Sequence, residues 1–342
     1  MIDILKEGLN ALFISVIASL IFAPIMITIL YKFNQVSGIK KSKIGGGDGD
    51  NTLFMRIMNV TKTNGTPNMG GILIWILVPI LCYFLVPLTP VVKIFLLGFL
   101  LYGLWGFIDV VIFTNGFKNN ARMRAFQETF EWRLGKLAFA TVMNIIIMFL
   151  FYRTGAFESI SFLNIATITV TPLIVILTGG LCQLAIYSAE LTDGLDGLMI
   201  GIFSIINMSM ITLLVIQGKN EFIPILLILL GVQLIDLYFN IPPARFWNGG
   251  PGAMPLGFTM FFVALVTDNL LPYFAMSSIT WGIMASSAIQ IISMKFFKRR
   301  VFRIAPIHHH FQAKGWPQYK VTMRFWLFTA ITGIIGIYLG IL

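Results

Sequence analysis

Three consecutive histidines, His308, His309 and His310, stand in a basic loop between two apolar stretches of the chain. Consecutive residues point in different directions, so the run lacks the spacing with which histidines usually bind zinc. Imidazoles beside Arg303 and Lys314 are better suited to hold a phosphate group or to transfer a proton. Taken alone, the run is equally consistent with an ordinary surface loop.

Acidic residues are scarce, and several of them gather near the ends of apolar stretches. Asp109 ends one such stretch, and Glu190, Asp193 and Asp196 follow another. The three-residue step from Asp193 to Asp196 would put both carboxylates on one side if that segment were helical. Ionised groups at or inside a bilayer are costly and are therefore functional candidates. A single carboxylate would merely mark the end of a span, but several beside a histidine-rich loop indicate a site.

A glycine-rich segment, residues 65–71, precedes a further apolar stretch and contains Asn68. Glycines beside the start of a helix allow the backbone to approach an anion closely, and the helix N-terminus favours the negative charge. Taken alone, a generic glycine-rich turn is weak evidence for an anion-binding site.

The elements that must position these side chains are transmembrane helices. The 342 residues are 57% hydrophobic and 11% charged, whereas soluble chains carry about 25% charged residues. The apolar runs are continuous and long enough to cross a core of about 30 Å, which favours helices over a barrel. We predict an all-α polytopic membrane protein with a single membrane domain, residues 1–342, and about ten spans, at about 9–31, 70–88, 92–113, 134–153, 166–187, 197–216, 222–240, 256–275, 278–296 and 322–341.

The distribution of Lys and Arg, which favour cytoplasmic loops, predicts the orientation. Most of the 24 basic residues fall in alternate loops, which places both termini outside. The expected cytoplasmic loops are about 32–69, 114–133, 188–196, 241–255 and 297–321, and all of the motifs above lie in these loops or at the span ends next to them. The net charge of +10 then suits anionic lipid headgroups or a polyanionic diphosphate substrate, and we expect no nucleic-acid partner.

These motifs and their order resemble the family of phospho-MurNAc-pentapeptide translocases (MraY), over nearly the whole chain. The most discriminating part is the histidine block followed by Lys-Gly-Trp-Pro at 314–317. Leu-Thr-Asp-Gly-Leu-Asp-Gly at 191–197, the glycine-rich segment, and the Asn-Ile-Pro-Pro-Ala stretch that begins at Asn240 resemble other motifs of the family.

The resemblance implies an enzyme of the bacterial inner membrane whose active face is cytoplasmic. Members transfer phospho-MurNAc-pentapeptide from UDP-MurNAc-pentapeptide to undecaprenyl phosphate, release UMP, and form lipid I for peptidoglycan synthesis. Mg²⁺ is the cofactor that the resemblance implies, and a homodimer within the lipid bilayer is the implied assembly.

The family's functional positions can be carried over residue by residue. Asp109 matches a proposed base or phosphate organiser, and His308 and His309 match histidines close to the phosphates. The implied substrate-binding positions are Asp193, Gly194, Asp196, Trp247, His310, Asn68, Lys62 and Glu190. Among them, Asp193, Gly194 and Asp196 match the nucleoside site, and Trp247 replaces a phenylalanine that lies near the uracil.

The chain departs from the family pattern at acidic positions. Val110 replaces the second aspartate of a pair, and Gly250 replaces the aspartate that binds magnesium in the family. The metal ligands are therefore unknown, with Asp109, Asp193 and Glu190 as the remaining candidates.

Two hypotheses follow from the retained and the missing motifs. The first is a divergent translocase, which acts on the family's donor or on a different UDP-sugar. The second is a relative of the same fold that binds a nucleotide-sugar or a prenyl phosphate without turnover. An unrelated transporter would not explain why the polar motifs lie at one face rather than near the midplane of the bilayer.

Overall fold

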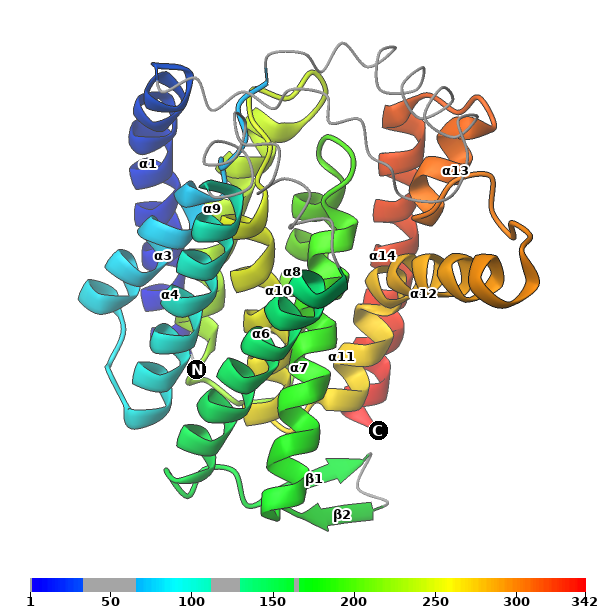
Figure 1. Ribbon diagram of the computed structural model, residues 1–342. Helices are drawn as coiled ribbons and strands as arrows, with labels where there is room; N and C mark the ends of the chain where they lie inside the picture. The colour runs from blue at the N-terminus through cyan, green and yellow to red at the C-terminus, as the bar shows by residue number, and fades with distance from the viewer. Residues whose placement is uncertain (1, 33–65, 112–129, 163–165) are drawn as a thin grey trace.

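The computed structural model describes residues 2–32, 66–111, 130–162 and 166–342, and these are nearly all helical (Figure 1). One antiparallel hairpin, β1 (Ser159–Phe162) and β2 (Ala166–Thr169), adds a small sheet to the predicted all-α fold. The helices are α1 (Ile2–Lys32), α3 (Ile72–Leu85), α4 (Pro90–Val111), α6 (Phe130–Tyr152), α7 (Pro172–Thr192), α8 (Leu198–Gln217), α9 (Ile223–Asn240), α10 (Gly250–Val266), α11 (Leu270–Met276), α12 (Ser278–Ile292), α13 (Ile307–Ala313) and α14 (Gln318–Ile341), with a π-helical turn, η2 (Ser293–Phe297), after α12.

Seven helices in the described part of the chain are long and apolar enough to cross a bilayer. An eighth span is formed if α11 and the continuous helix α12–η2, which meet at an angle of 69°, count as one broken span. Helices α3 and α10 are apolar but have 14 and 17 residues, fewer than the roughly 20 that a straight span needs. The count of about ten spans therefore stays a prediction.

Two predicted spans have different boundaries in the structure. Helix α7 begins at Pro172 rather than at residue 166, because residues 166–169 form strand β2 and the hydroxyl of Thr171 caps the helix by accepting from the amide of Ile174. The span predicted for 256–275 begins at Gly250 and ends at Val266. Its chain turns at Asn269, whose side-chain amide donates to Thr267 and interacts with Gln217.

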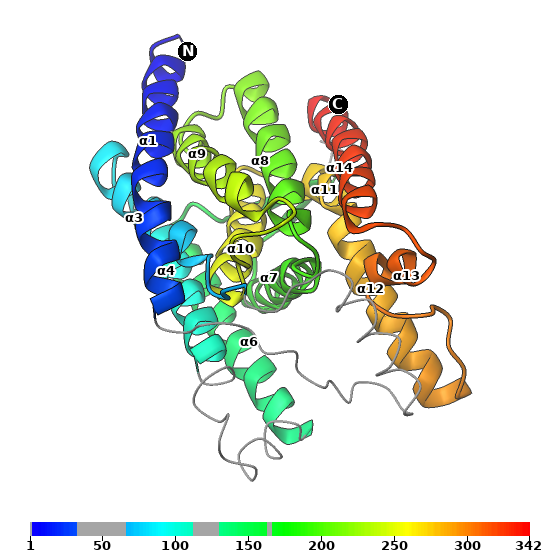
Figure 2. The same ribbon diagram turned by 90° about the horizontal axis from the view of Figure 1, so that it is seen from above.

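Helix α10 occupies the centre of the bundle, between α4, α7 and α9 in the view from above (Figure 2). Its residues from Pro251 to Leu265 are all buried. Gly98 of α4 lets the ring of Phe258 pack directly on the α4 backbone, where an added Cβ would overlap the ring. Phe95 and Phe262 complete the aromatic packing between these two helices. This close packing fixes the N-terminus of α10 relative to the end of α4.

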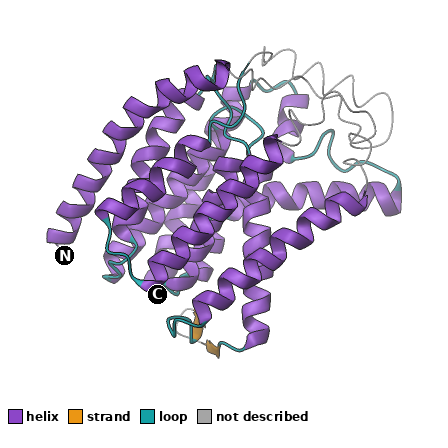
Figure 3. Ribbon diagram, turned by 60° about the vertical axis from the view of Figure 1, so that its left-hand side comes forward, coloured by secondary structure: helices purple, strands orange, loops and turns teal. Residues whose placement is uncertain are grey.

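The loops that carry the motifs lie at the end of the bundle opposite the hairpin (Figure 3). Both chain ends lie toward the hairpin end (Figures 1 and 3). Helix α12 leaves the bundle sideways and α13 lies between α12 and α14 (Figures 1 and 2). The motifs of the central helices and the histidine block therefore meet at one end of the molecule.

Candidate active site

Two loops are joined by backbone hydrogen bonds at this end. The amide of Trp247 donates to the carbonyl of Pro67 at 2.9 Å, and the amide of Gly70 donates to the carbonyl of Trp247 at 2.8 Å. The amide of Gly71 donates to the carbonyl of Asn248 at 3.1 Å. The glycine-rich segment is thus attached to the loop between α9 and α10, residues 241–249. We call the contact between residues 66–71 and 241–249 the loop junction.

The glycines of this junction serve close packing. A Cβ on Gly70 would overlap the ring of Phe246, and one on Gly71 would overlap the backbone of Gly252. Asn68 lies beside Gly249, with its side-chain oxygen 2.7 Å from where a Cβ on Gly249 would stand. The glycines that suggested an anion-binding turn in the sequence are therefore also needed for the close packing of these two loops.

Asp193 and Asp196 hold the same loop at different points. The segment from Asp193 to Gly197 is a turn between α7 and α8, not a helix. One carboxylate oxygen of Asp193 accepts from the amide of Gly249 at 2.7 Å. The carboxylate of Asp196 accepts from the indole nitrogen of Trp247 at 2.9 Å and from the amide of Ala244 at 3.3 Å.

The environment of Asp193 changes its acidity. Burial raises the pKa of Asp193 from 3.8 to about 6, the bond from the Gly249 amide opposes this change, and the nearby charge of Asp196 adds to it. The carboxylate is therefore mostly ionised at neutral pH and takes up a proton near pH 6, a property typical of groups in functional sites.

His308 packs against the turn that contains Asp193. Its side chain is fully buried, and a Cβ on Gly194 would overlap its Nε2 atom. Burial, with a smaller effect of His309, lowers the pKa of His308 well below 6.5, so the imidazole is neutral at pH 7. Neither ring nitrogen has a hydrogen-bond partner among the described residues. A buried imidazole in this state has one donor and one acceptor for a ligand.

The other two histidines have hydrogen-bond partners. Nδ1 of His309 lies 2.8 Å from Oε1 of Gln312, and burial lowers the pKa of His309. Nδ1 of His310 accepts from the amide of Arg303 at 3.0 Å. His310 thus holds the basic loop in place, while the His308 and His309 rings lie side by side, 4.3 Å between centroids.

A second group of charges lies at the ends of α4, α6 and α7. Asp109 forms an ion pair with Lys136 of α6. Glu190 stands in the last turn of α7, within electrostatic range of Asp109, Lys136 and Asp193. Val110 lies close to Gly249, 3.6 Å from where a Cβ on that glycine would stand. These charges are therefore neighbours of the loop junction.

Sequence reasoning did not give roles to three residues that support the site. The buried carboxylate of Asp236 accepts from the side-chain amide of Asn248 at 2.9 Å. Asn240, one turn further along α9, accepts from the amide of Gly197 at 2.9 Å and donates to the carbonyl of Phe246 at 2.7 Å. Their four-residue spacing on an apolar helix was the available signal. The pairing of Lys136 with Asp109 was also not predicted, and Lys62 lies outside the described residues.

The described residues do not fit the Mg²⁺ site that the resemblance implies. A Cβ on Gly250 would stand 2.8 Å from Cα and 3.0 Å from the carbonyl oxygen of Gly106, so an aspartate has no room there without backbone movement. No three acidic, histidine or cysteine side chains in the described ranges are grouped so that they could hold a metal ion. Asp109 and Asp193 are engaged by Lys136 and by the Gly249 amide.

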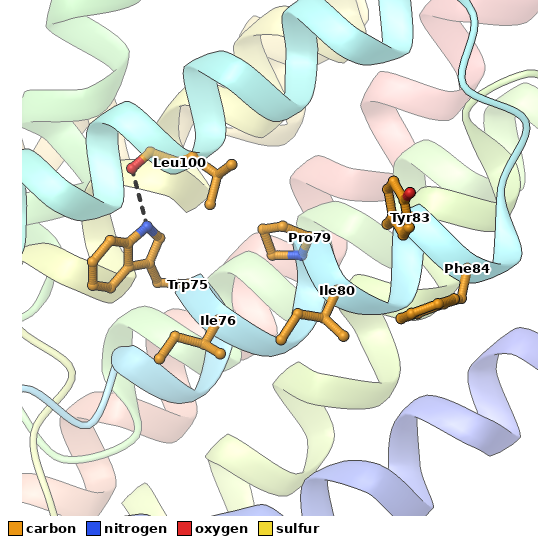
Figure 4. A pocket seen from close by; sticks show the side chains of 7 residues that line it. All are labelled: Trp75, Ile76, Pro79, Ile80, Tyr83, Phe84 and Leu100. Carbon is orange, nitrogen blue, oxygen red and sulfur yellow. Dashed lines mark hydrogen bonds between the residues drawn. The ribbon is translucent and has the colours of Figure 1, made fainter.

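An apolar groove on the outer side of α3 is separate from this site (Figure 4). It has a volume of about 380 Å³, and no acidic, basic or histidine side chain lines it. Its lining residues are Trp75, Ile76, Pro79, Ile80, Tyr83, Phe84 and Leu100. The groove therefore offers contacts for hydrocarbon and no groups for phosphate chemistry.

Comparison with known proteins agrees with the motifs. The profile of glycosyl transferase family 4 matches residues 92–268, just over half of the chain. A phospho-N-acetylmuramoyl-pentapeptide-transferase of Desulforapulum autotrophicum is 30% identical over 332 aligned residues, which cover 89% of this chain and 86% of that protein. One of a Geobacillus species is 30% identical over 290 residues, which cover 82% of this chain and 85% of that protein. The chain therefore belongs to glycosyl transferase family 4, as a divergent member of the phospho-N-acetylmuramoyl-pentapeptide transferases and hence a membrane phosphoglycosyl transferase by family.

Proposed function

We propose that this protein transfers phospho-MurNAc-pentapeptide from UDP-MurNAc-pentapeptide to undecaprenyl phosphate, forming lipid I and releasing UMP. The observation that carries the proposal is the neutral imidazole of His308, buried against the Asp193–Gly197 turn with both ring nitrogens unpartnered among the described residues. Such a side chain can donate one hydrogen bond to a phosphate oxygen and accept another from a substrate group. The same junction contains the indole ring of Trp247, on which a nucleobase can stack.

The reaction exchanges one phosphorus–oxygen bond for another. An oxygen of the acceptor phosphate attacks the phosphorus that carries the sugar, and the bond from this phosphorus to the oxygen of UMP breaks. Phosphoryl transfer of this kind depends on positioning and on electrostatic stabilisation more than on covalent help from the protein. The protein's task is therefore to align two anionic groups.

The assigned residues have separate tasks in this proposal. Trp247 stacks on the uracil, and Asp196 is a positioning residue because it fixes the plane of the indole through its N–H. His308 contacts the diphosphate, and His309, oriented by Gln312, lies beside it. Asp109 organises the acceptor phosphate together with Lys136, whose ammonium offsets negative charge.

The setting of the reaction is part of the same proposal. The enzyme would act as a homodimer in the bacterial inner membrane, with the loop junction on the cytoplasmic side, where UDP-linked donors are soluble. The basic loops near the histidine block suit a diphosphate substrate, because a positive face raises the local concentration of anions.

A second function, binding without turnover, is favoured by one observation. Gly250 and Val110 leave the junction without two carboxylates of the family pattern, and the packing of Gly250 on Gly106 leaves no space to restore the first. Such a protein would retain affinity for a nucleotide-sugar or a prenyl phosphate and release no UMP.

UMP release by the purified protein in detergent separates the two functions. We expect release only when UDP-MurNAc-pentapeptide and undecaprenyl phosphate are both present. His308→Asn should abolish release, whereas His310→Asn, which can still accept from Arg303, should reduce it much less. Equal loss in both variants would contradict the distinct role of His308. Binding of UDP by the wild type without any UMP release would favour the second function.

A further inference from the structure

The end of the arm formed by α12 and η2 is an exposed basic and aromatic surface. We call residues 295–301, Lys-Phe-Phe-Lys-Arg-Arg-Val, the arm tip, and every one of them is exposed. Phe296 and Phe297 are 69% and 68% exposed, and Val301 is 53% exposed. The arm tip is the part of α12–η2 farthest from the bundle (Figures 1 and 2).

The positive charge of this region has no acidic counterpart in the nearby sequence. No Asp or Glu follows Asp268, while Lys295, Lys298 and Arg299 stand in the arm tip with further basic residues on both sides of α13. A charge pattern of this kind attracts anions from the surroundings.

We propose that the arm tip is a binding site for the headgroups of anionic phospholipids in the bilayer that surrounds the protein. Basic side chains attract anionic headgroups, and the apolar rings of Phe296 and Phe297 beside them can be buried at the boundary between headgroups and acyl chains. The 69° bend between α11 and α12 directs α12 sideways out of the bundle. Exposed Ile291 and Ile292 extend the apolar surface of the arm toward the bundle.

The arm tip is also connected to the histidine helix. Oγ of Ser293 donates to the carbonyl of Arg299 at 2.7 Å, and Oε1 of Gln290 accepts from the amides of Val301 and Phe302 at 3.2 and 3.0 Å. The amide of Ile307, the first residue of α13, donates to Oγ of Ser286 at 3.0 Å. A lipid held at the arm tip would therefore steady α12 and, through these bonds, the position of α13.

Lipid selectivity of the full-length protein tests the proposal. The protein is placed in phosphatidylcholine nanodiscs without any prenyl phosphate. The association of spin-labelled phosphatidylglycerol is then compared with that of spin-labelled phosphatidylcholine with the same acyl chains. The tip variant Lys295→Gln/Lys298→Gln/Arg299→Gln is matched by Lys6→Gln/Lys93→Gln/Arg153→Gln, which removes the same charge from exposed positions outside the arm.

We expect the wild type and the matched control to prefer phosphatidylglycerol. Because each cation near an anionic surface contributes about fivefold, the preference should fall by at least ~10-fold in the tip variant. Raising the salt from about 0.1 M to about 1 M shortens the Debye length from about 10 Å to about 3 Å and should weaken the wild-type preference.

Three results would overturn the proposal: an unchanged preference in the tip variant, an equal loss in the matched control, or a wild-type preference that salt does not affect. Loss of UDP binding together with the lipid preference would assign these cations to the nucleotide instead. The salt titration uses only the wild type, so the test holds even if a variant fails to fold.

Discussion

Replacing Gly250 tests whether this fold can hold the family's metal-binding carboxylate. A Cβ at this position would stand 2.8, 3.2 and 3.0 Å from Cα, C and O of Gly106, and ordinary contacts are about 3.5–4.0 Å. Both partners are backbone atoms of packed helices, α10 and α4, so neither can move as a flexible side chain would.

The expected cost of Gly250→Ala follows from this geometry. Overpacking a close-packed interior costs about 1–3 kcal/mol, and the rigid backbone contacts here favour about 2–3 kcal/mol. At an unfolding entropy of about 2.1 cal/mol/K per residue, each kcal/mol lowers the melting temperature of a 342-residue chain by about 1.4 °C, so the decrease should be about 3–4 °C. Gly250→Asp should lower the melting temperature at least as much, because a carboxylate is larger than the methyl group of alanine and needs more space.

Thermal unfolding in detergent and Mn²⁺ binding measured by electron paramagnetic resonance provide the assay. Gly282→Ala is the matched control, because a Cβ there meets nothing within 4 Å. It should be neutral or slightly stabilising, since alanine has the higher helix propensity. The reasoning would be refuted if Gly250→Asp were as stable as the wild type and bound one Mn²⁺ that the wild type does not bind.

Other predictions concern the junction itself. Gly194→Ala should displace His308 and reduce UMP release by at least ~10-fold, and unchanged release would contradict their close packing. UMP release should decrease as the pH falls through about 6, because Asp193 then loses the charge that holds the Gly249 amide, and Asp193→Asn should lack this step. The effect of pH on stability has the opposite sign, because the folded protein binds this proton more tightly than the unfolded chain. The contribution of Asp193 to the free energy of unfolding should therefore fall as the pH rises from about 4 to about 6. Urea unfolding of the wild type and of Asp193→Asn can measure this change. Asp196→Ala should weaken UDP binding about 10-fold, because the indole of Trp247 loses its partner, and an unchanged dissociation constant by calorimetry would remove this positioning role.

The helical class and the grouping of motifs could be predicted from the sequence because both follow from local patterns. Long apolar runs define helices, and the scarce carboxylates stand at their ends, so Asp109, Asp193 and the histidine block fell at one face. The start of α7 at Pro172 was not predicted, because a proline after apolar residues reads equally as a kink or as a first turn.

The contacts that build the junction depend on tertiary packing, which periodicity does not encode. Nothing local indicates that Asp193 accepts from Gly249, 56 residues away, or that Gly194 packs on His308. The pairing of Asp236 with Asn248 was missed because a buried carboxylate on an apolar helix shows its partner only after the loops are placed. The loss of a metal position at Gly250 was visible in the sequence, but its steric cause, Gly106, was not.

The most direct test of the proposed function is detection of the lipid-linked product. The purified protein is incubated with UDP-MurNAc-pentapeptide and undecaprenyl phosphate, and the lipid fraction is analysed by mass spectrometry beside Asp193→Ala and a known transferase as a working control. We expect that undecaprenyl phosphate gains the mass of phospho-MurNAc-pentapeptide in the wild type, with an equal amount of UMP released, and that the variant forms far less. An unmodified lipid in the wild-type reaction, with UDP-MurNAc-pentapeptide still bound by the protein, would contradict it.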